Sequence, residues 1–394
     1  MAGDRAERSG GGLSRRSMGW ARAIAAASVI GLISPGGAGA GEPAKDGSRA
    51  RADDGSRSGT PAPKHTGVRR FEIGQGPRSY WLFEPDGPRP DSAPVLVFLH
   101  GWFSVNPAFY GAWIDHLVRD GNVVIFPRYQ NDVGTMPKDF LPNAMAAIHD
   151  AIGVLSIGSE RGVPHVRPDT RRFALIGHSA GANLAAQVAA LSTDSHAAIP
   201  VPRALLAILP GEVLPRRHPT LDHIPAATLM IVAVGDEDIV VGDQRGREIF
   251  AEATAIPPSR KRFILFRSDR HGFPPLIADH MAPTGTDPKL DNGEGVLRGL
   301  QLSMGEVNAM DHAGFWRITD LTLHAAFEGR TLDDVARDPE QLRHLGYWSD
   351  GRRVTPPIVD TNLDAVPRVV PGNGLKIFPW SNLRRVALGA SHSR

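Results

Sequence analysis

The sequence predicts an α/β fold in which helices cover both faces of a mostly parallel central sheet. Short apolar runs alternate along the chain with segments of helical periodicity, which is the order typical of strand–helix–strand units. Most runs are apolar at every position, as strands buried on both faces should be. In such sheets, sites lie at the carboxyl ends of the strands, so polar residues there are the first candidates for chemistry.

The individual elements follow in chain order. Two alternating runs at 69–73 and 79–83 predict strands at the start of the ordered part of the chain. Continuous apolar runs then predict buried strands at 94–99, 122–126, 172–176, 204–209, 228–234 and 262–266. Helical segments are predicted at 109–119, 143–155, 180–191 and 314–327.

Residues 1–40 have the order of a secretory signal peptide. Basic residues precede an apolar run at 23–33, and small residues follow as far as Ala40, where cleavage is expected. The pair Arg15 and Arg16 leaves both a Sec and a twin-arginine route open. Because the run is too short to span a bilayer comfortably, we expect export to the periplasm or the extracellular space without stable membrane insertion.

Three further segments complete the predicted organisation. Residues 41–67 are rich in Gly, Ser, Pro and charged residues, which predicts a disordered linker. Residues 68–329 carry the strand–helix alternation and form the predicted catalytic domain. Residues 330–394 hold few strand signals and a tail rich in Pro and Gly, so they are expected to be a C-terminal extension.

Composition excludes several classes of function. The chain contains no cysteine, which excludes disulfides, thiolate metal sites and a cysteine nucleophile. The first 70 residues carry twelve Lys and Arg against six Asp and Glu, whereas the remainder carries 32 against 36. The folded part therefore has no basic excess, and we expect no nucleic-acid partner.

The pentapeptide GHSAG, residues 177–181, directly follows a predicted buried strand and opens a predicted helix. A serine at a sharp strand-to-helix turn needs very small neighbours, which Gly177 and Gly181 provide, and its hydroxyl then projects above the sheet. With this motif the chain, over roughly residues 69–329, resembles the α/β-hydrolase superfamily. The resemblance implies that Ser179 is the catalytic nucleophile.

The resemblance also implies an oxyanion hole built from backbone amides. His100-Gly101-Trp102 ends the strand at 94–99, where this superfamily places its second oxyanion loop. The amides of Trp102 and Ala180 are therefore the expected pair of donors. His100 is expected to brace this loop rather than to act as a base.

A serine hydroxyl needs a base, and the superfamily order is serine, acid, histidine. His271, just after the strand at 262–266, is the expected general base, with His280 as the alternative. Asp238 fits the Gly-x-x-Asp spacing of the family after the strand at 228–234 and is the expected acid, with Asp236 as the alternative.

The surroundings of these residues resemble uncapped esterases, including dienelactone-hydrolase-like, acetylhydrolase-like and polyester-hydrolase-like enzymes. The stretch 209–228 is too short for a large cap between the sixth and seventh strands. The long excursion at 273–312 is the expected substrate rim, and Trp102, Phe103 and Phe273 are the expected substrate-binding residues. An acidic group that superficially resembles a calcium loop is interpreted as a solvated turn: Asp287, Asp291, Asn292 and Glu294.

The expected activity is therefore hydrolysis of a small-molecule or polymeric carboxylic ester through an acyl-enzyme, by a monomer without cofactor or metal. A peptidase, a thioesterase or an acyltransferase with the same triad remain as alternatives, because they change only the substrate or the acceptor. A catalytically silent binding protein is a fourth alternative, since the fold alone does not decide function.

Overall fold

The computed structural model describes residues 62–131, 134–160, 163–195, 197–212, 219–295, 298–303 and 305–370. All of them belong to one compact unit, Lys45–Arg394. The predicted signal peptide and the first part of the predicted linker, together residues 1–61, lie outside the described residues. The same holds for residues 371–394 of the predicted extension.

Nine strands of the described chain form one sheet in the order β1-β2-β4-β3-β7-β8-β9-β10-β11. Six neighbouring strands, from β4 to β10, are parallel, and antiparallel strands flank them on both sides. Their bounds are β1 Gly67–Ile73, β2 Tyr80–Asp86, β3 Ser92–Leu99, β4 Val123–Pro127, β7 Arg167–His178, β8 Ala204–Ile208, β9 Leu229–Gly235, β10 Lys261–Phe266 and β11 Ile358–Asp360. The mostly parallel sheet is therefore confirmed.

Both faces of the sheet are buried, which explains why its strands are apolar at every position. Alternate residues of a strand point to opposite faces. In β3, Val97 and Leu99 belong to one hydrophobic cluster and Leu96 and Phe98 to a second. Every residue of β9 is buried. The two clusters form the cores on the two sides of the sheet.

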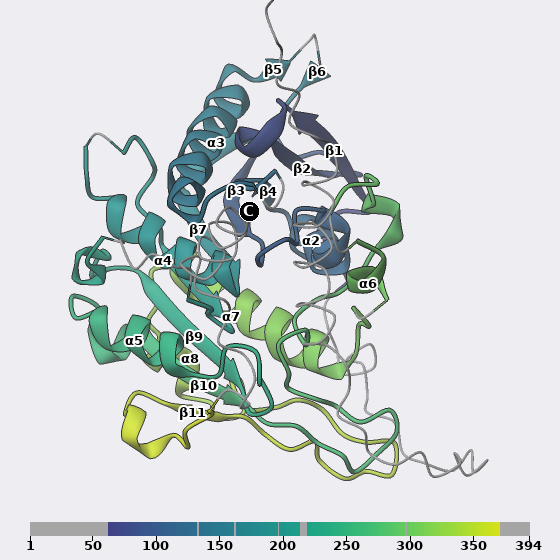
Figure 1. Cartoon of the computed structure of the whole chain (residues 1–394), viewed down its shortest axis with the longest axis vertical. Coiled ribbons are helices and arrows are strands. Elements are labelled where there is room, and N and C mark those ends of the chain that lie inside the picture. The colour runs from purple at the N-terminus through teal and green to yellow at the C-terminus, as the bar shows by residue number, and fades with distance from the viewer. Residues whose placement is uncertain are drawn as a thin grey trace, which may run out of the picture. The chain divides into compact units, whose positions relative to one another are not determined.

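Helices complete both cores, as Figure 1 shows. On one side lie α3 (Pro137–Ile157), α4 (Ala180–Leu191) and α5 (Gln244–Glu252). On the other lie α2 (Gly111–Arg119) and α7 (Arg317–Phe327), the latter continuing a π-helical turn at Met310–Trp316. The predicted arrangement of helices on both faces is confirmed, and the architecture is that of the α/β-hydrolase fold.

Helix α3 differs from the predicted segment because it starts at Pro137 rather than at 143. Proline is well suited to the first turn of a helix, where its missing N–H has no intrahelical acceptor. By length and composition alone this helix could cross a membrane. Its side chains Phe140, Ile148 and Leu155, however, are part of the core.

The connections agree with the expected absence of a large cap between the sixth and seventh strands. Only residues 209–228 join β8 to β9, and 213–218 of these lie outside the described residues. The longer excursion follows β10 and carries the short helix α6, Arg298–Leu302. Beyond α7 come α8 (Leu332–Ala336) and strand β11, which pairs with β10. The expected C-terminal extension thus contributes the edge strand of the sheet.

Candidate active site

Ser179 occupies a strained turn between β7 and α4. Its φ of 56° lies in the left-handed region, which non-glycine residues rarely adopt. A Cβ atom at Gly177 would overlap the carbonyl oxygen of Gly181, and one at Gly181 would overlap that of Leu99. Glycine is therefore required at both positions, and the turn presents the hydroxyl of Ser179 at the carboxyl edge of the sheet.

Two side chains from distant parts of the chain line up with this hydroxyl. His280 Nε2 lies 2.9 Å from Ser179 Oγ, and His280 Nδ1 lies 2.8 Å from Asp238 Oδ2. Asp238 is fully buried, and its second carboxylate oxygen accepts hydrogen bonds of 3.0 Å from the amides of Val240 and Val241. The carboxylate is thus held in one orientation against the imidazole.

The expectation that His271 lies beside Ser179 is wrong. Its Nε2 contacts Asp350 at 2.7 Å, and its Nδ1 contacts the guanidinium of Arg352 at 2.9 Å. The alternative histidine, His280, takes the place beside the serine.

The local chain path explains this correction. Backbone hydrogen bonds pair Asp269 with Leu276, so residues 270–275 form the tip of a small hairpin that carries His271. The chain then returns to the sheet, where the carbonyl oxygen of Ala278 packs against Gly235 and accepts the amide of Glu237. His280 follows this return and therefore reaches the strand ends.

The two aspartates after β9 have different partners. Asp238 contacts His280, whereas Asp236 accepts the amide and the hydroxyl of Ser268 at 2.9 and 2.8 Å. The geometry of Asp236 is that of a turn residue which joins the ends of β9 and β10. Of the two alternatives, the structure brings Asp238 to the histidine that contacts Ser179.

The loop after β3 lies directly against Ser179. A Cβ atom at Gly101 would stand 3.4 Å from Cβ of Ser179. Phe103 has a left-handed φ of 66°, and its amide donates to Gln130 at 3.0 Å. The rings of Trp102 and Phe103 stack at 5.2 Å. Ala180 opens α4, so its amide is one of those without an acceptor inside the helix.

His100 supports the loop after β3. Its ring is fully buried, stacks on Tyr129 at 4.1 Å, and has Nε2 2.8 Å from the carbonyl oxygen of Arg128. Burial lowers the pKa of His100 to about 4. A neutral histidine held between these groups has the geometry of a support rather than of a base.

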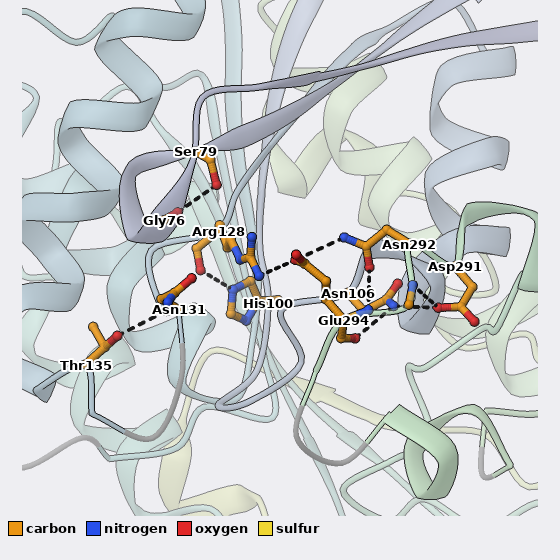
Figure 2. A network of polar contacts seen from close by, with 11 residues as sticks. Gly76, Ser79, His100, Asn106, Arg128, Asn131, Thr135, Asp291, Asn292 and Glu294 are labelled. Carbon is orange, nitrogen blue, oxygen red and sulfur yellow. Dashed lines mark hydrogen bonds and ion pairs between the residues drawn. The ribbon is translucent and has the colours of Figure 1, made fainter.

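Figure 2 shows a polar network that ties the excursion after β10 to this support. The side-chain amide of Asn106 donates to Asp291 at 2.7 Å and to the carbonyl oxygen of Glu294 at 3.0 Å, while the Glu294 carboxylate pairs with Arg128. The guanidinium of Arg298 beside Asp291 lowers the pKa of that carboxyl. These acidic residues are thus paired with cations and amides. Among the described residues no cluster of metal-ligating side chains is found.

The expected substrate-binding residues lie in two places. Trp102 and Phe103 are on the loop beside Ser179, whereas Phe273 is on the hairpin tip that carries His271 and is 58% exposed. The structure therefore separates Phe273 from the segment that carries His280.

Gly211, which the sequence analysis did not single out, faces the serine. A Cβ atom there would lie 3.2 Å from Ser179 Oγ, 3.6 Å from the amide nitrogen of Ala180 and 3.1 Å from a methyl group of Val241. Its amide donates to the carbonyl oxygen of Ser179 at 3.1 Å. The signal was present in the sequence, because Pro210-Gly211 follows the carboxyl end of a buried strand.

Comparison with known proteins agrees with this fold. The model of the family described as Chlorophyllase matches residues 62–224, and that family consists of α/β-hydrolase-like esterases. The matched stretch includes Ser179 and the loop after β3, while Asp238 and His280 lie beyond it. A search of curated proteins gave no match.

Proposed function

Since this chain is a hydrolase of the α/β-hydrolase superfamily, we propose that it cleaves carboxylic esters with Ser179 as nucleophile, His280 as general base and Asp238 as the orienting acid. The observation that carries the proposal is the continuous line of contacts from Asp238 through His280 to Ser179, at 2.8 and 2.9 Å. Nucleophile, base and orienting group within hydrogen-bond reach are what activation of a serine hydroxyl requires.

The protonation states follow from the partners. An ionised carboxylate can only accept, so Nδ1 of His280 carries the proton that is donated to Asp238. Nε2 then holds a lone pair toward the hydroxyl of Ser179. In the acylation step the hydroxyl proton moves to Nε2, the Oγ–carbon bond forms, and the carbonyl electron pair moves onto oxygen.

The tetrahedral intermediate collapses when its carbon–oxygen bond to the alcohol breaks, and the imidazolium of His280 protonates the leaving alkoxide. A water molecule then gives a proton to His280, attacks the acyl-enzyme and releases the acid with Ser179 restored. The amides of Ala180 and Trp102 are the proposed oxyanion donors. Two observations support this pair of donors. Ala180 is the first residue of α4, and Gly101, which precedes Trp102, lies close to Ser179.

The test combines an active-site label with ester turnover. We expect a fluorophosphonate to label the protein at Ser179, and p-nitrophenyl esters to be hydrolysed. Ser179→Ala should lose both, whereas Ser192→Ala, at the other end of α4, should keep both, because its hydroxyl bonds only the local carbonyl oxygen of Ala189. Full turnover by Ser179→Ala would refute the proposal. Amide and thioester substrates in the same assay test the peptidase and thioesterase alternatives.

Export remains a proposal as well. The signal-peptide order of residues 1–40 supports it, and these residues lie outside the described part of the structure. Sequencing the N-terminus of the secreted protein tests it, with cleavage expected after Ala40.

A further inference from the structure

Three segments meet behind the proposed nucleophile, and the side chains of His178 and Tyr110 lie at their junction. The amide of Gly101 donates to Tyr110 Oη at 2.9 Å, and that oxygen lies 2.8 Å from His178 Nδ1. His178 Nε2 lies 3.0 Å from the backbone carbonyl oxygen of His280. A single chain of contacts thus joins the loop after β3, the turn of the nucleophile and the loop of the proposed base.

The partners assign every proton in this chain. Burial and the neighbouring His280 hold the pKa of His178 well below its usual range, so the ring carries one proton. A carbonyl oxygen can only accept, which places that proton on Nε2, facing His280. Burial raises the pKa of Tyr110 to about 12, so its hydroxyl is intact and donates to Nδ1. The Gly101 amide then donates to the same oxygen, and each contact has one donor and one acceptor.

The junction is also closely packed. A Cβ atom at Gly101 would lie 3.2 Å from both Tyr110 Oη and His178 Nδ1. Tyr110 is fully buried, His178 is 3% exposed, and their rings meet edge to face at 5.8 Å. The loop after β3 therefore lies in close contact with both Tyr110 and His178.

We propose that Tyr110 and His178 are positioning residues, which set the amide of Trp102 and the ring of His280 relative to Ser179. The inference rests on the proposed ester hydrolysis. Gly101 immediately precedes the proposed oxyanion donor, and the carbonyl that His178 holds belongs to the proposed base itself. A shift of one ångström in either group is enough to slow a reaction about 100-fold.

Removal of the Tyr110 hydroxyl is the first test. Tyr110→Phe keeps the ring in the core but removes the contacts of the hydroxyl with Gly101, His178 and the side chain of Ser104. We therefore expect kcat for p-nitrophenyl acetate to fall roughly 10- to 100-fold with little change in KM. Tyr80→Phe is the matched control, because it also removes a buried hydroxyl, one that bonds Asp150 on α3. The control should keep the wild-type kcat. A Tyr110→Phe enzyme as fast as Tyr80→Phe would overturn the inference.

His178 provides the second test. His178→Gln places a carbonyl oxygen and an N–H group about as far apart as the two ring nitrogens, so it can accept from Tyr110 and donate to His280. His178→Leu can do neither. We expect the leucine variant to lose activity as Tyr110→Phe does and the glutamine variant to recover most of it. Equal losses in both variants would show a purely structural role.

The double variant Tyr110→Phe/His178→Leu tests whether the two residues act as one unit. Because either change breaks the same chain, the combined loss should be close to the larger single loss. Losses that multiply would contradict the inference. If the wild-type protein takes no fluorophosphonate label and cleaves no ester, the proposed function fails. Failure of the positioning role alone leaves the wild-type label and turnover intact.

Discussion

His280 Nε2 lies 2.9 Å from the hydroxyl oxygen of Ser179, a residue 101 positions earlier in the chain. The contact joins the turn after β7 to the loop that returns to the sheet after β10. Ser179 is 8% exposed, and its hydroxyl, already hydrogen-bonded to a histidine, can transfer its proton without moving.

The two histidines after β10 should differ sharply in their effect on turnover. His280→Ala removes the proposed base, and we expect kcat to fall about 1,000-fold or more. His271→Ala removes only a partly exposed ring that contacts Asp350 and Arg352, and it should stay within about twofold of the wild type. Steady-state kinetics with p-nitrophenyl acetate measures both. A greater loss in His271→Ala than in His280→Ala would reverse the assignment.

The aspartates after β9 form a second matched pair. Asp238→Asn should lower kcat by about 10⁴-fold, because the amide no longer holds the imidazole in the tautomer that the reaction needs. Asp236→Asn keeps an oxygen that can accept from Ser268, so its turnover should be close to that of the wild type. The same assay decides between them, and near-normal turnover in Asp238→Asn would exclude it as the acid.

Gly211 should be intolerant of even one methyl group. Its φ lies outside the left-handed region, so alanine causes no backbone strain, but the methyl would stand 3.2 Å from Ser179 Oγ. We expect Gly211→Ala to lower kcat/KM roughly 10- to 100-fold without lowering the melting temperature.

The control for Gly211 is Gly153→Ala in α3, where an added Cβ would meet nothing within 4 Å. That variant should keep full activity and gain about 0.5–1 kcal/mol of stability, since alanine is the better helix former. Equal activity of Gly211→Ala and Gly153→Ala would contradict the claim that a methyl group at position 211 crowds Ser179.

Asp311 should make the free energy of unfolding fall as the pH rises. It is fully buried in the π-helical turn, and its Oδ1 has no partner among the described residues. Burial raises its pKa to about 7. The pKa of this carboxyl is higher in the folded state than its unfolded value of 3.8. The carboxyl therefore contributes in full to the free energy of unfolding below pH 3.8, and this contribution is lost as the pH rises toward 7.

Asp311→Asn removes this titration, and we expect it to raise stability at pH 8 by on the order of 2 kcal/mol relative to the wild type. Asp169→Asn is the opposite case, because Arg172 and Arg171 lower the pKa of Asp169 despite its burial. That variant should be less stable than the wild type at pH 8. Urea unfolding at pH 4 and pH 8 measures both, and an Asp311→Asn protein that is less stable at pH 8 would contradict the account.

The fold was predictable because its signals are local. Strands such as β9 are apolar at every position, and only burial on both faces accounts for that pattern. Ser179 was predictable for the same reason, since the glycines that its turn requires are adjacent in sequence.

The position of the proposed base, His280, was not predictable by the rule that sites follow strand ends. His271 comes first after β10, but the pairing of Asp269 with Leu276 turns it away, and His280 is brought back by the contact of Ala278 with Gly235. Neither contact leaves a pattern in the sequence. The edge strand Ile358–Asp360 was missed for a related reason, since its place in the sheet depends on its pairing with β10.

The most direct test is a crystal structure of the protein after reaction with a fluorophosphonate. We expect phosphorus bonded to Ser179 Oγ, a phosphoryl oxygen within hydrogen-bond distance of the amides of Ala180 and Trp102, and the ring of His280 beside the adduct. An adduct on another residue, or a His280 ring turned away while His271 contacts the phosphonate, would contradict the proposed site.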